Sequence, residues 1–142
     1  MSLPENRKNF DNLLQKWLVI EENSIDMSND LINQSKNPLV KTMIELIKID
    51  SEKHKHILEA IRLSLHSTVV FSQEDMLLVD SFIEKHEAVE KNAIATAEQA
   101  VETGSLPIPK LLLTHLLEDE KSHDIYTEQL TNLKAYMAKH TQ

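Results

Sequence analysis

The chain has no cysteine, one glycine and four prolines among its 142 residues, and aromatic residues make up only 4% of it. The lack of cysteine excludes disulfides, thiolate zinc sites, cysteine-ligated iron–sulfur clusters and thiol nucleophiles. A composition poor in glycine and proline and rich in Leu, Ile, Glu, Lys and Ala favours an all-α fold. Any metal ion in this protein would therefore have to be bound by carboxylate and imidazole groups.

Basic blocks and long apolar runs are also lacking. The formal net charge is −8, with 15 Lys and Arg residues scattered among 23 Asp and Glu residues, which argues against a nucleic-acid-binding surface. No stretch approaches the roughly 18 consecutive apolar residues of a transmembrane helix, and the N-terminal residues lack the apolar run of a signal peptide. We therefore expect a cytoplasmic protein that binds neither nucleic acid nor membranes.

Proline, glycine and serine residues divide the chain into four predicted helices. Pro38 suits the first turn of a helix, and Gly104 is expected to cap the end of one. Ser72 with Asp75 resembles a helix N-cap. The predicted helices cover residues 4–35, 38 to between 61 and 66, 72–104, and 107 to near the C-terminus.

Each predicted helix has about 30 residues and is about 45 Å long. An antiparallel four-helix bundle that forms one domain, residues 1–142, is the simplest way to bury four such helices. The connection at residues 67–73 can span at most about 25 Å when extended, and its β-branched residues favour an extended conformation. A long crossover between the second and third helices and a plain up-and-down order are both open.

Ionisable residues interrupt the apolar face of each predicted helix near its middle. In the last helix, Glu120 and His123 lie among leucines at helical spacing, where hydrocarbon is expected. His86 and Glu90, four residues apart, share one face of the third helix in the same way. The ionisable residues predicted to face inward are Glu21, Asp50, His54, His86, Glu90, Asp119, Glu120 and His123.

The two halves of the chain carry this pattern at a constant shift of 69 residues. The shift superposes Glu21 on Glu90, Pro38 on Pro107, Asp50 on Asp119 and His54 on His123. The pattern predicts two copies of one helical hairpin, each with a carboxylate on its first helix and a carboxylate–histidine group on its second. Trp17 occupies the position in the first half that His86 occupies in the second.

This arrangement resembles the ferritin-like di-iron carboxylate proteins, in which a Glu on helices one and three and a Glu-x-x-His motif on helices two and four point into a four-helix bundle. Within that superfamily the chain is most similar to rubrerythrin-type domains, over nearly its whole length. The resemblance implies that Glu21 and Glu90 are terminal carboxylate ligands and that Glu120 is a bridging one. His54 and His123 would be the paired imidazole ligands.

Ser51 departs from the family pattern, because a second bridging Glu is expected three residues before His54. Four carboxylates are needed to neutralise two divalent ions, so Asp50 would turn inward, His86 would replace a ligand, or fewer ions would bind. The full candidate set is Glu21, Asp50, His54, His86, Glu90, Glu120 and His123, which could hold one ion or two. A hydrogen-bonded network of these groups without metal is the alternative.

A ligand set of carboxylates and imidazoles suits iron, with manganese or zinc as alternatives. The resemblance implies an oxidoreductase that handles oxygen or peroxide, and a homodimer or larger homo-oligomer. An external electron donor would be needed because the chain has no cysteine to ligate a second iron centre. The competing interpretation, which Ser51 favours, is a metal-free ferritin-like bundle that serves as a structural, stress-related or protein-interaction module.

Overall fold

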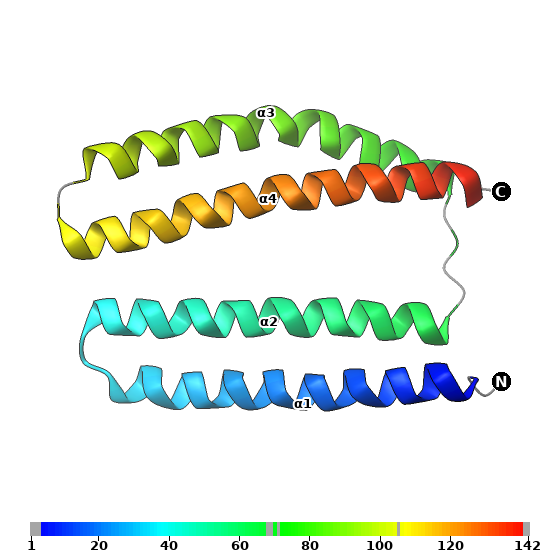
Figure 1. Cartoon of the computed structure of the whole chain (residues 1–142), viewed down its shortest axis with the longest axis horizontal. Helices are drawn as coiled ribbons and strands as arrows, with labels where there is room; N and C mark the ends of the chain where they lie inside the picture. The colour runs from blue at the N-terminus through cyan, green and yellow to red at the C-terminus, as the bar shows by residue number, and fades with distance from the viewer. Residues whose placement is uncertain (1–3, 68–69, 71, 105, 141–142) are drawn as a thin grey trace. The chain divides into compact units, whose positions relative to one another are not determined.

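The computed structural model describes residues 4–67, 70, 72–104 and 106–140. These residues form the helices α1 (Glu5–Gln34), α2 (Pro38–His66), α3 (Gln73–Thr103) and α4 (Pro107–His140), and none of them is in a strand (Figure 1). The predicted all-α class is therefore confirmed. The observed helix bounds lie close to the bounds predicted from proline, serine and glycine.

The starts of two helices follow from their capping residues. Helix α2 has Pro38 in its first turn, and the side chain of Asn37 accepts two backbone hydrogen bonds from that turn. Helix α3 begins with a capping box: the Asp75 N–H donates to Ser72 Oγ at 3.1 Å, and the Ser72 N–H donates to Asp75 Oδ2 at 3.0 Å. These two hydrogen bonds pair backbone donors that the first turn of a helix leaves free. The hydrogen bond from the Ser72 N–H to the Asp75 carboxylate, helped by the Ser72 side chain, also lowers the pKa of the Asp75 carboxyl.

Gly104 ends α3, as predicted, but a left-handed backbone is not the reason. Its φ of −70° is accessible to any residue. A Cβ at this position would lie 3.2 Å from the backbone oxygen of Ala100 and 3.2 Å from Cδ1 of Leu113. The missing side chain therefore lets the end of α3 approach α4 closely.

The helices form two units, Met1–Val69 and Val70–Gln142. In one unit α1 packs along α2, and in the other α3 packs along α4 (Figure 1). We call the α1–α2 unit the first hairpin and the α3–α4 unit the second hairpin. Each hairpin joins its two helices through a short connection, so inward side chains of one helix meet those of its partner at matching depth.

The first hairpin has an apolar cluster formed by Leu14, Leu18 and Leu58, against which Ile61 and Leu65 pack. These residues repeat at helical spacing and form one stripe on each helix. A pair of helices can bury only a narrow stripe, and large apolar side chains outside it stay in contact with solvent.

Small hydroxyl side chains bring α1 and α2 together beyond this cluster. Ser28 and Ser51 are buried, with 2% and 6% of their surfaces exposed. Ser51 Oγ donates to Ser24 Oγ at 3.0 Å across the two helices, and Ser28 Oγ donates to the Ser24 backbone oxygen at 2.8 Å. The helices thus meet here through hydrogen-bonded serines.

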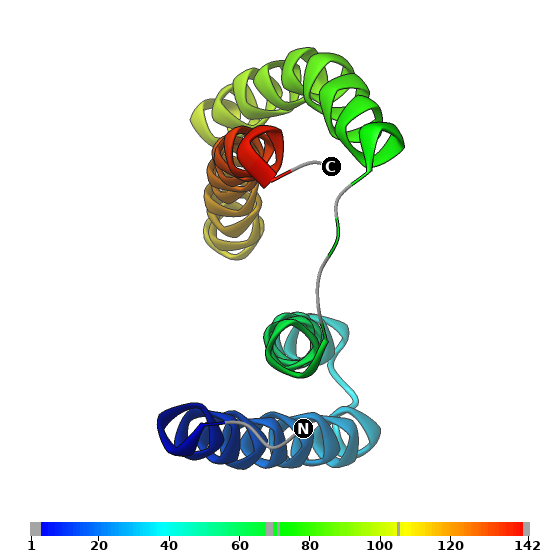
Figure 2. The same ribbon diagram turned by 90° about the vertical axis from the view of Figure 1, so that its right-hand side faces the viewer.

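The second hairpin buries a methionine and a carboxylate most deeply. Met137 is 1% exposed and Glu90 is 2% exposed. Asp80 on α3 forms an ion pair with Lys134 on α4. Helix α3 is bowed along its length in two perpendicular views (Figures 1 and 2). Helices that wrap around a packed partner commonly curve in this way.

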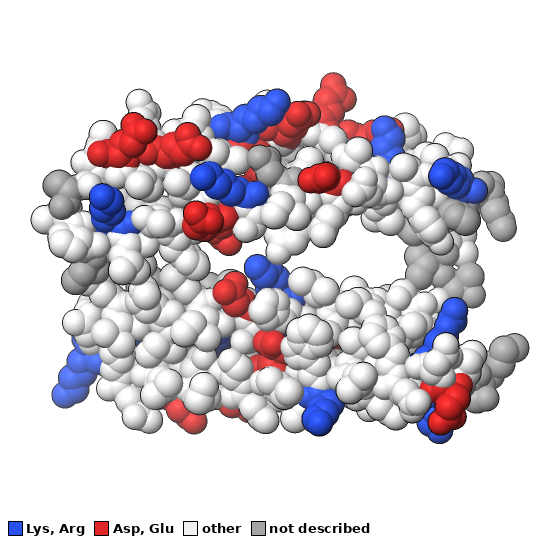
Figure 3. Space-filling view, viewed as in Figure 1, with Lys and Arg blue, Asp and Glu red and all other residues white. Residues whose placement is uncertain are grey.

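Charged side chains of both signs lie along α3 and α4. On the face drawn in Figure 3, lysines and arginines are interspersed with acidic residues and do not gather into one patch. Within the described part of the chain, no helix combines the length and the apolar character needed to cross a membrane.

The connection between the hairpins, predicted to be extended at residues 67–73, lies partly outside the described residues because 68, 69 and 71 are not among them. The crossover and up-and-down alternatives therefore stay predictions.

Candidate metal centre

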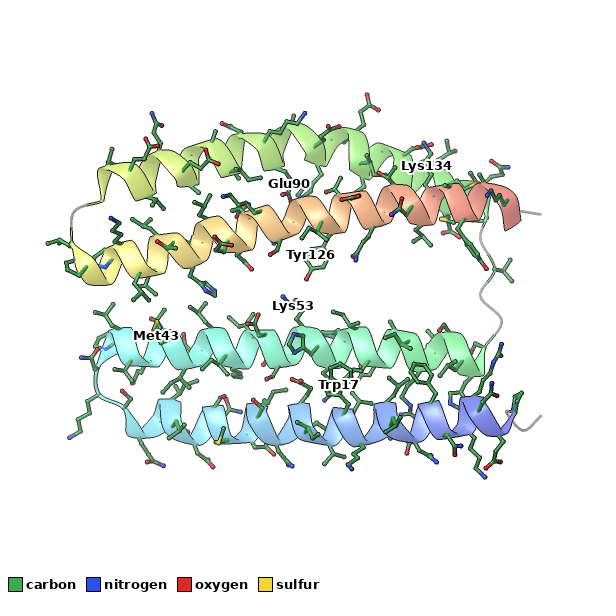
Figure 4. All side chains as sticks on the ribbon, viewed as in Figure 1. Trp17, Met43, Lys53, Glu90, Tyr126 and Lys134 are labelled. Carbon is green, nitrogen blue, oxygen red and sulfur yellow. The ribbon has the colours of Figure 1, made fainter. Side chains whose placement is uncertain are left out.

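Glu90 on α3 lies between α3 and α4 and is 2% exposed (Figure 4). Its Oε1 is 2.6 Å from His86 Nε2 and 3.3 Å from His123 Nδ1. Its Oε2 is buried and has no hydrogen-bond partner. A buried acceptor without a partner costs about 1–3 kcal/mol, and a charged one costs more. A bound cation would remove this cost, so Oε2 is a natural ligand atom.

Glu120 and His123 on α4 complete a group of three possible ligands with Glu90. One ligand atom from each residue lies within 4.8 Å of the other two. His123 Nδ1 is 3.7 Å from Glu120 Oε2 and 3.3 Å from Glu90 Oε1. Around an ion with bonds of about 2.0–2.2 Å, neighbouring ligand atoms are about 3.0–3.5 Å apart. The two distances from His123 Nδ1 are therefore close to those between the ligand atoms of a metal site.

His86 holds one oxygen of Glu90. Its ring stacks on Phe82, with centroids 4.8 Å apart and an interplanar angle of 22°. A proton on Nε2 lets His86 donate to Glu90 Oε1 at 2.6 Å, one helical turn further along α3. With Oε1 engaged in this way, the carboxylate has a defined orientation and Oε2 is the oxygen left for another partner.

A pocket of about 260 Å³ lies beside Glu90 in the second hairpin. Its lining includes the rings of Phe82, His86, His123 and Tyr126. The pocket gives a small ion a path to the carboxylate, and it leaves room for the water molecules that complete a coordination shell.

The first hairpin contains a smaller version of this arrangement. Glu21 on α1 is 9% exposed, and its Oε1 accepts a hydrogen bond from Trp17 Nε1 at 3.2 Å. His54 Nδ1 on α2 is 3.4 Å from the same oxygen. Trp17 and His86, which the 69-residue shift superposes, thus stand in the same relation to their glutamates, and so do His54 and His123.

Asp50 and Ser51 on α2 differ in the side of the helix on which they lie. The Asp50 side chain is 54% exposed and is 3.6 Å from Lys53 Nζ, whereas Ser51 is buried against α1. Among the described residues the structure therefore groups Glu21 with His54, and groups Glu90 with His86, Glu120 and His123. It does not bring Asp50 into either group.

The reasoning from sequence missed the contact between Trp17 and Glu21. A signal for it was present, because Trp17 precedes Glu21 by the same four residues that separate His86 from Glu90. The contact matters because an indole N–H can donate a hydrogen bond but cannot ligate a metal. The first hairpin therefore has fewer possible ligands than the second.

A second feature that the sequence did not indicate is an ion cluster around the buried carboxylate of Asp11. Arg62 Nε donates to Asp11 Oδ1 at 2.8 Å, and His66 Nε2 is 3.1 Å from Oδ2. Chiefly because of the hydrogen bond from Arg62, and against the opposing effect of burial, the pKa of Asp11 is lowered to about 2. Arg62 lies 51 residues further along the chain, beyond the reach of any local pattern. Asp11 is already paired with the Arg62 guanidinium, so it is not a metal-ligand candidate.

Comparisons of the chain with protein-family models, with curated proteins and with solved structures found no match. The functional interpretation therefore depends on the residues of the chain and their geometry.

Proposed function

We propose that this protein binds a transition-metal ion through Glu90, Glu120 and His123. The observation that carries the proposal is the buried Oε2 of Glu90, which has no hydrogen-bond partner and belongs to a carboxylate that forms a group of three possible ligands with Glu120 and His123. Two carboxylates and one imidazole offer oxygen and nitrogen donors together, which favours iron, manganese or zinc over calcium or magnesium. Iron is the ion that the proposal names first.

The proposal includes a ferritin-like four-helix bundle built from the two hairpins. Matching contacts around Glu21 and Glu90 support it, because they extend the 69-residue sequence repeat to the level of individual atoms. Exposed apolar side chains in both hairpins also support it, with Leu13 at 63% and Leu77 at 67%. A second layer of helices would remove such apolar surface from water.

Bound iron would supply one-electron redox chemistry toward dioxygen or peroxide. The residues of the chain then have separate tasks: Glu90 and Glu120 neutralise the ion, and His123 adds a nitrogen ligand. His86 holds Glu90 in place, and the rings of Phe82 and Tyr126 limit the water around the site. Electrons would come from an external donor, because the chain contains no cysteine for a second iron centre.

The competing proposal is a metal-free bundle that acts as a structural or protein-interaction module. It is favoured by the contacts of the two buried glutamates. Oε1 of Glu21 and Oε1 of Glu90 each already accept a hydrogen bond or lie near an imidazole nitrogen of the protein. It leaves Glu90 Oε2 without a partner, which is the reason we prefer the metal site.

The test is metal content measured by elemental analysis, on protein purified without chelator and then titrated anaerobically with Fe²⁺. The wild-type protein is expected to retain iron after desalting. His123→Ala and Glu120→Ala should each lose it, since each removes one of three ligands. Glu118→Ala is the matched control, because Glu118 is exposed on the same helix. No uptake by folded wild-type protein would rule out the metal site and leave the metal-free module.

A further inference from the structure

The number of inward carboxylates limits how many ions the proposed centre can hold. Among the described residues, three inward glutamates lie in the two hairpins: Glu21, Glu90 and Glu120. Two divalent ions need about four negative ligands for neutrality, whereas one ion needs about two. The pair Glu90 and Glu120 in the second hairpin meets the requirement of one ion by itself.

Ser51 occupies the position where a fourth carboxylate would be required. The 69-residue shift places Ser51 on Glu120, so the first hairpin has a hydroxyl where the second has a ligand. Ser51 is 6% exposed, and its Oγ is bonded to Ser24 Oγ at 3.0 Å. This hydroxyl contributes to helix packing and supplies no negative charge.

The aspartates beside these positions do not compensate for the missing carboxylate. Asp50 precedes Ser51, and Asp119 precedes Glu120, so the shift superposes the two aspartates. Both are exposed, and Asp50 lies 3.6 Å from Lys53 Nζ. Because both are exposed, this register position faces solvent in both hairpins.

The α1 residues near Ser51 and the α3 residues near Glu120 also differ between the two hairpins. The shift places Ser24 on Ala93 and Ser28 on Ala97. Ala93 and Ala97 line a pocket of about 470 Å³ together with Glu120, so the second hairpin has space beside its carboxylate. In the first hairpin, hydrogen-bonded serines lie at the corresponding positions.

We propose that the protein binds one metal ion per chain, held by the second hairpin, and that Ser51 with Ser24 excludes a second ion. This inference rests on the proposed metal-binding function. In this proposal Glu21 and His54 form a counterpart of the site that takes no ion, with Glu21 Oε1 engaged by Trp17. The chain would thus differ from the di-iron proteins that its sequence resembles.

The test exchanges residues between matching positions of the hairpins: positions 24 and 51 in the first and positions 93 and 120 in the second. Ser24→Ala with Ser51→Glu gives the first hairpin the residues that the second has, and Ala93→Ser with Glu120→Ser does the reverse. Ser24→Ala with Ser51→Ala is the control that removes the hydroxyl pair without adding charge. Full-length proteins are titrated anaerobically with Co²⁺ and with Fe²⁺. The bound ions per chain are counted by elemental analysis, and the Co²⁺ absorption bands report coordination.

We expect one ion in the wild type and in the control, two in the Ser24→Ala/Ser51→Glu variant, and none in the reverse exchange. Two ions in the wild type would overturn the single-ion inference while leaving the metal-binding function intact. No ion in the wild type would overturn the metal-binding function itself, and the inference with it. One ion in a Ser24→Ala/Ser51→Glu protein with wild-type helicity would overturn the role given to Ser51. If that variant fails to fold, the wild-type count alone decides between one ion and two.

Discussion

The two oxygens of Glu90 differ in their surroundings, and this difference underlies the interpretation of the site. Oε1 lies near two imidazole nitrogens, at 2.6 and 3.3 Å, whereas Oε2 is buried without a partner. Buried polar atoms in folded proteins are nearly always hydrogen-bonded, so each exception calls for a physical reason. The cation proposed to bind at Glu90 would supply that reason.

Substitution of His86 distinguishes a positioning role from direct ligation. Trp17 donates to Glu21 in the first hairpin as His86 does to Glu90 in the second, so tryptophan is a native donor at this register. We expect His86→Trp to keep metal affinity within about threefold of wild type, and His86→Phe to lower it by about tenfold or more, which is about 1.4 kcal/mol. Metal titration followed by Co²⁺ absorption measures both. Equal loss in the two variants would mean that His86 is itself a ligand.

Asp11 gives the first hairpin a dependence on acid pH. Its folded-state pKa of about 2 lies below the ordinary value of 3.8, chiefly because Arg62 donates to it. A depressed pKa stabilises the fold above the unfolded-state pKa, and this contribution is lost as the pH falls from about 4 to about 2. Urea unfolding across this range should show a smaller loss of unfolding free energy in Asp11→Asn than in wild type. Parallel curves for the two proteins would show that the ion cluster does not stabilise the fold.

At the scale of the helices, the sequence predicted where a helix begins or ends better than it predicted which side of the helix is buried. Pro38 and Ser72 marked helix starts, and Gly104 marked a helix end, because capping and chain reversal depend on residues close in sequence. Asp50 and Ser51 lie one step of about 100° apart around α2, and within the first hairpin Asp50 is on the exposed side and Ser51 on the buried side. Which of the two faces α1 is decided by how closely the serines let the helices approach, and a one-helix pattern carries no information about that.

For the candidate site as well, the sequence pointed to some of the residues but missed some of the contacts. Glu21, Glu90 and His123 were recognised because each interrupts an apolar stripe. The contact between Trp17 and Glu21 was missed because an indole in a stripe is itself apolar and does not stand out. The ion cluster at Asp11 was missed because it depends on tertiary packing over a long sequence separation.

Removal of the capping box of α3 tests the local account of its start. Ser72→Ala removes the acceptor for the Asp75 N–H and leaves one orphan donor in the first turn. We expect a loss of about 1 kcal/mol in unfolding free energy. Thermal or urea unfolding measures it, with Ser72→Asp as the control that keeps an acceptor. A Ser72→Ala protein as stable as wild type would mean that the start of α3 frays in solution.

At the scale of the whole molecule, the proposed bundle makes metal binding and stability interdependent. A ligand that binds only the folded protein raises the unfolding free energy, by about 2.7 kcal/mol when its concentration is a hundred times its Kd. The proposed ligands lie on two helices, Glu90 on α3 and Glu120 and His123 on α4, and the folded hairpin brings them together, so the unfolded chain would bind the ion more weakly. Metal should therefore stabilise the fold.

The most direct measurement is the melting temperature of the full chain with and without added Fe²⁺ under anaerobic conditions, for wild type, Glu90→Gln and Glu87→Gln. Glu87 is the matched control, since it is an exposed glutamate on α3 that pairs with Lys91 at 3.2 Å. We predict that Fe²⁺ raises the melting temperature of wild type and Glu87→Gln alike, and leaves that of Glu90→Gln unchanged. An equal rise in all three proteins, or no rise in wild type, would contradict the assignment of Glu90 as the centre of a metal site.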